Sequence, residues 1–350
     1  MSEDTRVSAL HVAVDAHNLT RDDRGIGRYA RAVLSRGLRA PDVRWTLVVR
    51  DLFPKRAALA AALAAKPGEI AVSRRVPPDA DVVWFPWNGT FLRAGAPSVA
   101  TVHDAAPFAF PAGDPRKRAT EQQPFIATAM TARRILVQSR FTAAEVTRWL
   151  AYDPAKVVVT PLAVDDVFTP GVATLPESLR GKRYVLHVGA HDERKNTDTL
   201  IAAFSHAFGD ASNGTLLVFT RRPPVLPAGA VVIDARDDAT LATLYRGAAL
   251  TAVPSYYEGF GFPVLEAMAC GSPVLAARAG ALPEVGGDAA AWVDDPRSTS
   301  AWADALRALL ADDATLTALA ARGPARAALF SWERCTAQTL AVLREVAAAR

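Results

Sequence analysis

The sequence is poor in cysteine and has no long apolar run. Its 350 residues include only two cysteines, Cys270 and Cys335, so neither a disulfide framework nor a metal-ligand cluster is indicated. No stretch reaches the uninterrupted apolar length of a membrane span, and the acidic, polar N-terminus lacks the apolar core of a signal peptide. We therefore expect a soluble protein in a reducing compartment, the cytoplasm.

Neither sign of charge dominates, since 40 basic and 36 acidic residues leave a net charge of +4. This mild basicity does not indicate a nucleic-acid partner. A helical pattern over 114–134 carries clustered cations at Arg116, Lys117, Arg118, Arg133 and Arg134. Such a cluster can contact an anionic membrane surface, but a charge run is more often a solvated face, so peripheral membrane contact is the less favoured interpretation.

Half of the residues are hydrophobic, which is enough for two domains of ordinary size. Apolar runs alternate with helical patterns in both halves, and this alternation predicts an α/β protein with two Rossmann-like parallel-sheet domains. A polar, proline-containing stretch over 161–180 is typical of a linker. We place the domains at 1–165 and 166–330, followed by a helix over 331–350.

The most informative stretch is 255–271. It is predicted to form a loop with Gly259 and Gly261, a short helix whose first residue is Pro263, and a helix end at Gly271. The N–H groups of such a helix start carry the positive end of the helix dipole, and the glycines allow a ligand to approach the backbone. A phosphate is the natural occupant of this position.

Two carboxylates frame the predicted phosphate site. Glu258 lies in the loop and Glu266 lies eight positions later in the helix. Carboxylates accept hydrogen bonds from sugar hydroxyls, so their presence beside a phosphate site indicates a phosphorylated sugar. The alternative is that both are ordinary surface glutamates. The segment SYYEGFGFPVLEAMACGSPVLAARAGALPEVGGDAA resembles the E-x7-E signature of the family-four retaining glycosyltransferases, which have the GT-B fold and use nucleotide sugars.

A second predicted phosphate contact follows the strand 184–189. Arg194 and Lys195 stand at the opening of a helix, where point charge and helix dipole add. The alternative is an exposed basic turn. The segment VGAHDERKN resembles the donor-phosphate segment of the same family.

Gly25 and Gly27 follow a predicted strand over Val7–Asp15 and precede a predicted helix over Arg28–Arg39. They could close over a phosphate or a sugar, or could serve a tight turn, and spacing alone does not decide between these. RGIGRYARAVL resembles the family's glycine loop, which faces the donor from the first domain.

His103 and Asp104 end a buried strand of the first half, and ligands of parallel sheets lie outside strand carboxyl ends. They could instead form a pair that holds a loop. HDAAPFAFP resembles the family segment whose histidine faces the donor sugar, which favours function for His103 and support for Asp104. Of two nearby tryptophans, Trp84 is predicted to be core, and Trp87 stays open between core and sugar stacking.

The resemblance implies transfer of a hexose, with retention of configuration, from a nucleotide sugar to a glycan or lipid-linked saccharide. GDP-mannose is favoured over a UDP-sugar. Glu266 would bind the ribose, and Glu258 the donor sugar. The closing helix would cross back onto the first domain. The residues implied to act in catalysis are Glu258, His103, Arg194 and Lys195. Those implied to contact the nucleotide sugar are Gly25, Gly27, Arg194, Lys195, Glu258, Gly259, Phe260, Gly261, Phe262 and Glu266.

No metal or other cofactor is expected, because the one Asp-x-Asp triplet, Asp79-Ala-Asp81, precedes a strand and so lies at the wrong end of the sheet. Two alternatives to an active transferase remain. One is a partner subunit of the same fold that binds nucleotide sugar without turnover, and the other is a phosphorylase or synthase acting on a storage polysaccharide.

Overall fold

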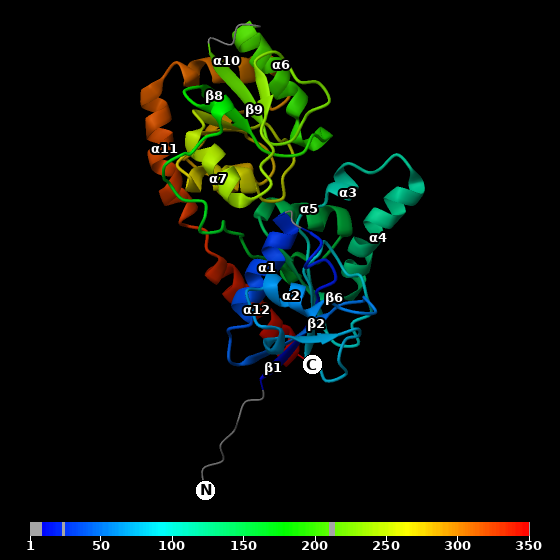
Figure 1. Cartoon of the computed structure of the whole chain (residues 1–350). Coiled ribbons are helices and arrows are strands. Elements are labelled where there is room, and N and C mark those ends of the chain that lie inside the picture. The colour runs from blue at the N-terminus through cyan, green and yellow to red at the C-terminus, as the bar shows by residue number, and fades with distance from the viewer. Residues whose placement is uncertain (1–8, 23–24, 210–213, 350) are drawn as a thin grey trace. The chain divides into compact units, whose positions relative to one another are not determined.

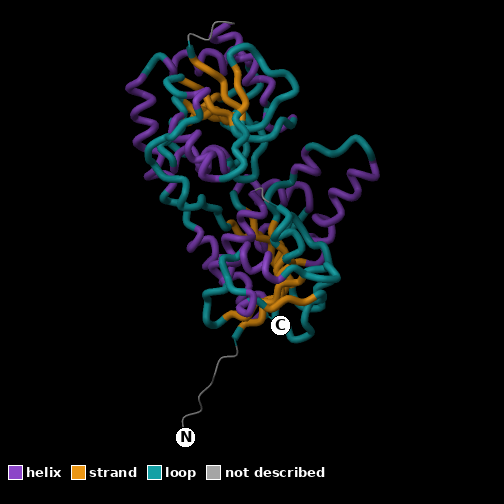
Figure 2. Tube along the Cα trace, in the orientation of Figure 1, coloured by secondary structure: helices purple, strands orange, loops and turns teal. Residues whose placement is uncertain are grey.

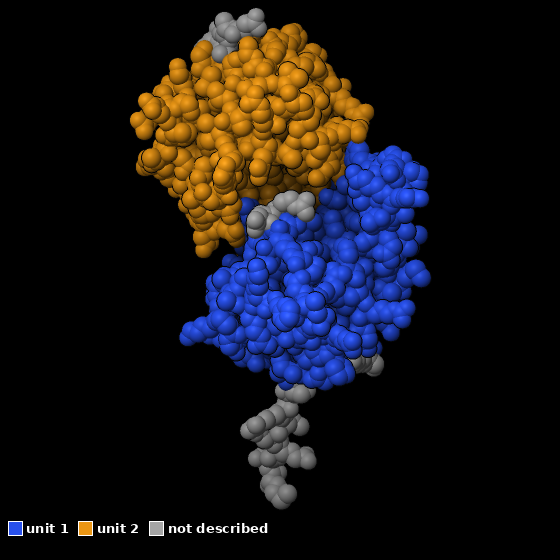
Figure 3. Space-filling model, turned by 45° about the vertical axis from the view of Figure 1, so that its right-hand side comes forward, with its two compact units in different colours: residues 1–162, 332–350 blue, residues 163–331 orange. Residues whose placement is uncertain are grey.

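The computed structural model describes residues 9–22, 25–209 and 214–349. The chain divides into two compact units, unit 1 with residues 1–162 and 332–350, and unit 2 with residues 163–331 (Figure 3). Each unit has a parallel sheet inside and helices outside (Figures 1 and 2). The predicted fold class, two Rossmann-like parallel-sheet units, is confirmed.

Within the described residues, unit 1 has a seven-stranded sheet in the order β3-β2-β1-β4-β5-β6-β7. The strands are β1 (Leu10–Asp15), β2 (Val43–Val48), β3 (Ala71–Ser73), β4 (Val82–Phe85), β5 (Ser98–Thr101), β6 (Ala132–Val137) and β7 (Val157–Val159). Residues 7 and 8 of the predicted first strand lie outside the described residues. The helices are α1 (Gly25–Gly37), α2 (Arg56–Ala62), α3 (Ala106–Ala109), α4 (Pro115–Thr131), α5 (Arg140–Leu150) and α12 (Trp332–Ala348), with short 3-10 turns at Pro67–Glu69 and Pro154–Lys156.

The described part of unit 2 has a six-stranded parallel sheet in the order β10-β9-β8-β11-β12-β13. The strands are β8 (Arg183–His187), β9 (Thr215–Phe219), β10 (Ala230–Val232), β11 (Leu250–Val253), β12 (Val274–Ala277) and β13 (Ala291–Val293). The helices are α6 (Thr197–Phe208), α7 (Asp238–Gly247), α8 (Phe262–Ala269), α9 (Leu282–Gly286), α10 (Thr299–Leu310) and α11 (Asp313–Ala327), with 3-10 turns η3 (Glu177–Leu179) and η4 (Glu193–Lys195).

Strands β4 and β12 are apolar along their whole length, as expected of parallel strands with both faces covered by helices. All four residues of β4 and all four of β12 are buried. Trp84 of β4 is fully buried, and its indole N–H donates to the Thr101 hydroxyl at 3.1 Å. The prediction that Trp84 is a core residue is confirmed.

The last helix, α12, packs on α1 and on strands of the unit 1 sheet. Its buried face includes Trp332, Cys335 and Leu343. At its edge, Arg36 of α1 donates to Glu333 at 2.8 Å. Since these contacts span almost the whole chain, the N-terminal and C-terminal segments belong to one folded unit.

The predicted basic helix over 114–134 is shorter than expected. α4 starts after Asp114, whose carboxylate accepts from the backbone of Arg116 and Lys117, and ends at Thr131. The prediction that Arg133 and Arg134 belong to this helix is wrong, because residues 132–137 pair with β5 and β7 as strand β6.

Both sheets reverse their strand order beside one central strand. β1 lies between β2 and β4 in unit 1, and β8 lies between β9 and β11 in unit 2. Ligands of parallel α/β sheets bind outside the carboxyl ends of strands at such reversals. The chain after β1 leads to α1, and the chain after β8 leads to η4 and α6. Among the described residues, no helix is long and apolar enough to cross a membrane.

Candidate functional site

The loop before α8 is shaped by Gly261. This residue caps the helix with φ +110°, and a Cβ here would lie 2.6 Å from Cδ2 of Leu282, so only glycine fits. α8 begins at Phe262, one residue before the predicted start at Pro263, and Gly271 follows its end with φ +75°. The predicted order of loop, short helix and buried strand is therefore present, with the glycine loop directly before the helix N-terminus.

Glu258 is almost buried in this loop. One carboxylate oxygen lies 2.5 Å from Nζ of Lys195, and the two side chains are 9% and 14% exposed. Burial alone would raise the pKa of Glu258, but the cation of Lys195 and, to a smaller extent, that of Arg194 hold this pKa below its usual value. Glu258 is therefore ionised at neutral pH and forms an ion pair with Lys195.

The backbone of Glu258 is fixed from the other side by Gly280. Ala281 N donates to Glu258 O at 3.0 Å, and a Cβ on Gly280 would lie 2.8 Å from Glu258 N. Gly280 has φ +57°, which also favours glycine. This third glycine was not singled out in the sequence, because its role depends on a segment 22 positions away in the chain.

Arg194 and Lys195 lie in η4, the turn that links β8 to α6. Asp192 caps this turn by accepting from Lys195 N at 3.0 Å, and Arg194 O accepts from Tyr256 N at 3.0 Å. The second contact joins the basic turn to the loop that carries Glu258. Asn196, in the left-handed conformation with φ 55°, donates to the carbonyl oxygens of Pro254 (3.1 Å) and Pro296 (2.6 Å). The two sequence segments predicted to hold phosphate are thus brought together.

His187 supports this arrangement and was missed in the sequence. It ends β8 and is buried, with Nε2 3.2 Å from the Thr197 hydroxyl and Nδ1 3.2 Å from Ala252 O. Burial, reinforced by the charge of Lys195, lowers its pKa to about 4. The imidazole is therefore neutral at pH 7 and adds no positive charge. A histidine at the end of an apolar strand was the available signal.

Glu266 has a different environment on the buried side of α8. It is 3% exposed, and Tyr245 of α7 donates to one carboxylate oxygen at 2.9 Å. Phe260 is also buried, with its ring centroid 5.7 Å from those of Phe262 and Phe330. The Phe260 side chain therefore belongs to an aromatic cluster, and its backbone is the part that could meet a ligand.

In unit 1, His103 follows β5 and is held on several sides. Its Nε2 lies 2.8 Å from Pro86 O, its backbone N–H donates to Asn88 at 2.6 Å, and Tyr29 contacts the ring edge-on at 5.0 Å. Burial lowers the pKa of His103. Asp104 accepts from Ala106 N at 3.0 Å, the contact of a residue that supports its own loop.

Gly25 and Gly27 lie in the first turn of α1, not in the loop before it as predicted. Position 27 requires glycine, because a Cβ there would lie 1.7 Å from Asp22 O. Trp87 is 4% exposed and its indole N–H donates to Asp15 O at 2.6 Å. Of the two interpretations left open for Trp87, core residue or sugar-stacking residue, the structure favours a core residue.

Comparison with known proteins identifies the family. Residues 182–312, all within unit 2, match the family model described as glycosyl transferases group 1. The chain is also 32% identical over 272 residues to O-antigen chain mannosyltransferase B of Escherichia coli, covering 69% of each protein. The chain belongs to the group 1 glycosyl transferases. The resemblance stated from the sequence is confirmed.

Other relatives of this group 1 glycosyl transferase match over shorter lengths. D-inositol 3-phosphate glycosyltransferase of Segniliparus rotundus is 31% identical over 159 residues, which is 40% of this chain and 35% of that protein. Among solved structures, sucrose-phosphate synthase of Thermosynechococcus elongatus has 21% sequence identity and a TM-score of 0.70. The match covers 97% of this chain and 100% of the synthase chain. The structure of Anabaena HepE in complex with UDP-glucose has 14% sequence identity and a TM-score of 0.72. The match covers 96% of this chain and 99% of HepE. These structures share the fold.

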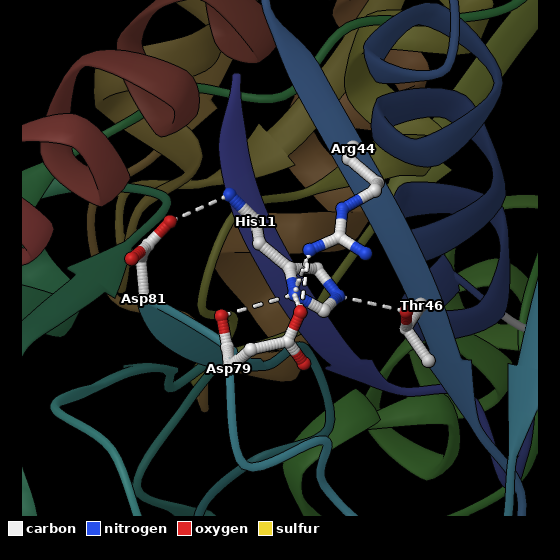
Figure 4. Close-up of polar contacts among 5 residues, drawn as sticks. All are labelled: His11, Arg44, Thr46, Asp79 and Asp81. Atoms are coloured by element: carbon white, nitrogen blue, oxygen red, sulfur yellow. Dashed lines mark hydrogen bonds and ion pairs between the residues drawn. The ribbon is translucent and has the colours of Figure 1, made fainter. Parts of the chain in front are cut away.

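The Asp-x-Asp triplet of this glycosyl transferase is engaged within its own sheet (Figure 4). Asp81 accepts from the backbone of His11 at 2.8 Å, and Asp79 accepts from Arg44 at 2.7 Å. Both aspartates precede β4, at the amino end of the sheet. Their predicted role at the strand entry is supported by these contacts. Among the described residues, no group of three or more His, Cys, Asp or Glu side chains is arranged to hold a metal ion.

Proposed function

We propose that unit 2 binds the diphosphate of a nucleotide sugar with Arg194, Lys195 and the N-terminus of α8. The observation that carries this proposal is the buried ion pair between Lys195 and Glu258, beside a helix start that only glycine can cap. A cation and a helix dipole attract phosphate, and the leaving diphosphate gains negative charge as the glycosidic bond breaks. Fixed positive charge at this point would stabilise the transition state.

The remaining roles follow from this placement of the diphosphate. Glu266 would accept hydrogen bonds from the ribose hydroxyls, with Tyr245 orienting its carboxylate. Glu258 would contact the transferred sugar, together with the backbone of Gly259, Phe260, Gly261 and Phe262. A carboxylate that already has a cation partner stays ionised and acts as an acceptor for sugar hydroxyls.

Unit 1 would bind the acceptor, a glycan or lipid-linked saccharide, and present His103 to the donor sugar. The neutral imidazole suits hydrogen bonding to a sugar hydroxyl, because a cation there would need a counter-charge. Gly25 and Gly27 would bring the start of α1 close to the donor. We assign a retaining mechanism in which the departing phosphate accepts the proton of the acceptor hydroxyl.

We further propose GDP-mannose as donor and transfer without a divalent metal. The mannosyltransferase relative supports mannose. Arg194 and Lys195 supply the charge that a metal would otherwise bring to the diphosphate. If activity is lost on exhaustive EDTA treatment and restored by Mg²⁺ or Mn²⁺, the metal-independent assignment is wrong.

The central test compares Arg194→Ala and Lys195→Ala with Lys182→Ala, which removes an exposed lysine of the same unit. Thermal shifts with GDP- and UDP-sugars identify the donor, and sugar transfer is then measured with that donor. Loss of one charged donor to the transition state typically lowers the rate about 10²–10³-fold. We expect such losses in the first two variants and wild-type rates in the third. Equal rates in all three, at matched folding, contradict the phosphate assignment.

The same experiment separates catalysis from binding alone. A partner subunit that holds nucleotide sugar without turnover would give thermal shifts that depend on Lys195 and no transfer with any donor. Transfer that depends on Lys195 excludes that alternative.

A further inference from the structure

Three arginines of unit 1 surround an open hollow that none of the proposed roles uses. Arg50, Ser73, Arg74 and Arg75 line this hollow, which has a volume of about 520 Å³. Arg50 lies two residues after β2, and Arg74 and Arg75 directly follow β3. The two strands are parallel neighbours, so the arginines converge at one carboxyl edge of the sheet, where parallel sheets bind ligands.

At Arg50 the positive charge of this arginine hollow is partly offset by Coulombic attraction to the buried carboxylate of Asp15. Across residues 9–22, 25–209 and 214–349, none of the three guanidinium groups forms an ion pair with a carboxylate. The nearest acidic residue in sequence, Asp51, is bound by Arg21 through contacts of 2.8 and 3.0 Å. The charge also reaches the neighbouring loop, since Arg50 and Arg21 add to burial in lowering the pKa of His17. An anion would find several unpaired donors here.

Two exposed apolar side chains lie close to Arg50 in the sequence. Leu52 and Phe53 follow Arg50 by two and three positions and are 70% and 88% exposed. Large apolar side chains at this exposure contact mainly water, and a cationic site with an apolar neighbour matches the boundary between lipid phosphates and acyl chains. A free phosphate would use only the arginines, whereas a lipid phosphate would use both groups.

We propose that the arginine hollow binds a phosphate or diphosphate group carried by a lipid, with Leu52 and Phe53 entering the apolar layer beside it. The lipid would be the one that carries the acceptor saccharide, and this part of the inference rests on the proposed function. It locates lipid contact at the β2–β3 edge of unit 1. The exposed turn of α4 with Arg116 and Lys117 is the competing location.

Co-sedimentation with vesicles tests the location. The vesicles contain phosphatidylcholine alone or phosphatidylcholine with phosphatidylglycerol. Arg74→Gln/Arg75→Gln is compared with Arg116→Gln/Lys117→Gln, which removes the same charge from α4. Each basic residue at an anionic surface changes affinity about fivefold. We expect the first variant to lose about 25-fold and the second to bind as wild type. Equal losses, or a loss confined to the α4 variant, overturn the proposal.

Two further arms distinguish lipid from free phosphate. Leu52→Ser/Phe53→Ser should weaken vesicle binding, whereas binding of inorganic pyrophosphate should be unchanged. Pyrophosphate is measured in an Arg194→Ala/Lys195→Ala background, so that the donor site does not contribute. If Leu52→Ser/Phe53→Ser binds vesicles as wild type does, the lipid assignment is wrong. If Arg74→Gln/Arg75→Gln does not weaken pyrophosphate binding, the anion site itself is wrong.

The failure of this proposal and the failure of the proposed function give different results. Nucleoside diphosphate binding by Arg74→Gln/Arg75→Gln, followed by thermal shift, should equal that of the wild type, because none of the residues proposed to hold the nucleotide sugar lines the hollow. A loss of nucleoside diphosphate binding in this variant overturns the assignment of the hollow to a separate ligand.

Discussion

Replacing Lys195 with methionine should destabilise the protein through the carboxylate that it leaves behind. Lys195 Nζ lies 2.5 Å from Glu258, whose side chain is only 9% exposed. Methionine keeps the apolar stem and removes the charge. Breaking a buried ion pair by removing one partner commonly costs about 3–5 kcal/mol, since the remaining charge is buried without compensation.

The structure sets an upper limit on this cost, because Glu258 can take up a proton instead. The reference pKa of this carboxyl is 4.5. Protonating it at pH 7 costs about 1.4 kcal/mol for each of roughly 2.5 pH units, or about 3.5 kcal/mol. Arg194 still lowers the pKa of Glu258 in the variant. We therefore expect the free energy of unfolding to fall by about 2–3 kcal/mol at pH 7.

The pH dependence has a defined sign. In the wild type the folded pKa of Glu258 is below 4.5, so its contribution to stability is present above pH 4.5 and is lost as the pH falls through the folded pKa. In Lys195→Met the folded pKa rises, so the folded state binds the proton more readily and recovers stability on acidification. The deficit of the variant should shrink to below about 1 kcal/mol at pH 5.

Urea unfolding of the wild type, Lys195→Met and Lys195→Met/Glu258→Gln at pH 7 and pH 5 measures these quantities. The double variant has no buried charge to compensate, so it should be more stable than the single variant at pH 7. A double variant no more stable than Lys195→Met, together with a deficit equal at both pH values, would refute the reasoning.

Three further predictions concern residues around the site. Burial lowers the pKa of His187 from 6.5 to about 4. Between these two pH values the unfolded chain binds a proton that the folded chain does not. The free energy of unfolding should therefore fall by about 2 kcal/mol from pH 7 to pH 5. Urea unfolding of His187→Asn should lack that contribution, and an unchanged slope contradicts it. Gly27→Ala should lower the melting temperature, because the added methyl group would lie 1.7 Å from Asp22 O. This clash should outweigh the better helix propensity of alanine. A higher melting temperature in a thermal scan would contradict the prediction. Tyr245→Phe removes one hydrogen bond to Glu266 and should weaken nucleoside diphosphate binding about fivefold, with little change in kcat. Titration calorimetry measures the affinity, and kinetics at saturating donor measure kcat. Unchanged affinity would count against a ribose role for Glu266.

The central strands and the glycine loop could be predicted because their signals are local. β4 and β12 are buried on both faces and so are continuous apolar runs in the sequence. Gly261 precedes a proline at a helix start, which is a local pattern with a backbone cause. Where a local pattern and a tertiary contact disagree, the contact decides. Gly27 is predicted to lie in a loop but lies in helix α1. The residue is glycine because Asp22 O leaves no room for a Cβ.

Other features depend on contacts between distant positions and gave no readable signal. Gly280 matters because it faces the backbone of Glu258. The arginine hollow joins Arg50 to Arg74 and Arg75, which are brought together only by the parallel pairing of β2 and β3. A sequence shows three arginines among many, and only the strand pairing shows that they share one edge.

The ion pair between Lys195 and Glu258 also bears on the proposed donor binding. Under the proposed function, a diphosphate that approaches Lys195 would compete with Glu258 for the same ammonium group, so donor binding would exchange part of one ion pair for another. The net affinity is then a difference between two electrostatic interactions, and removing the internal competitor should favour the phosphate. Glu258→Gln should therefore leave nucleoside diphosphate affinity undiminished while lowering sugar transfer, because the amide no longer competes for Lys195 but is a poorer acceptor for the sugar hydroxyls. Nucleoside diphosphate affinity that falls in Glu258→Gln and is unchanged in Glu266→Gln would show that the two glutamates have the opposite roles.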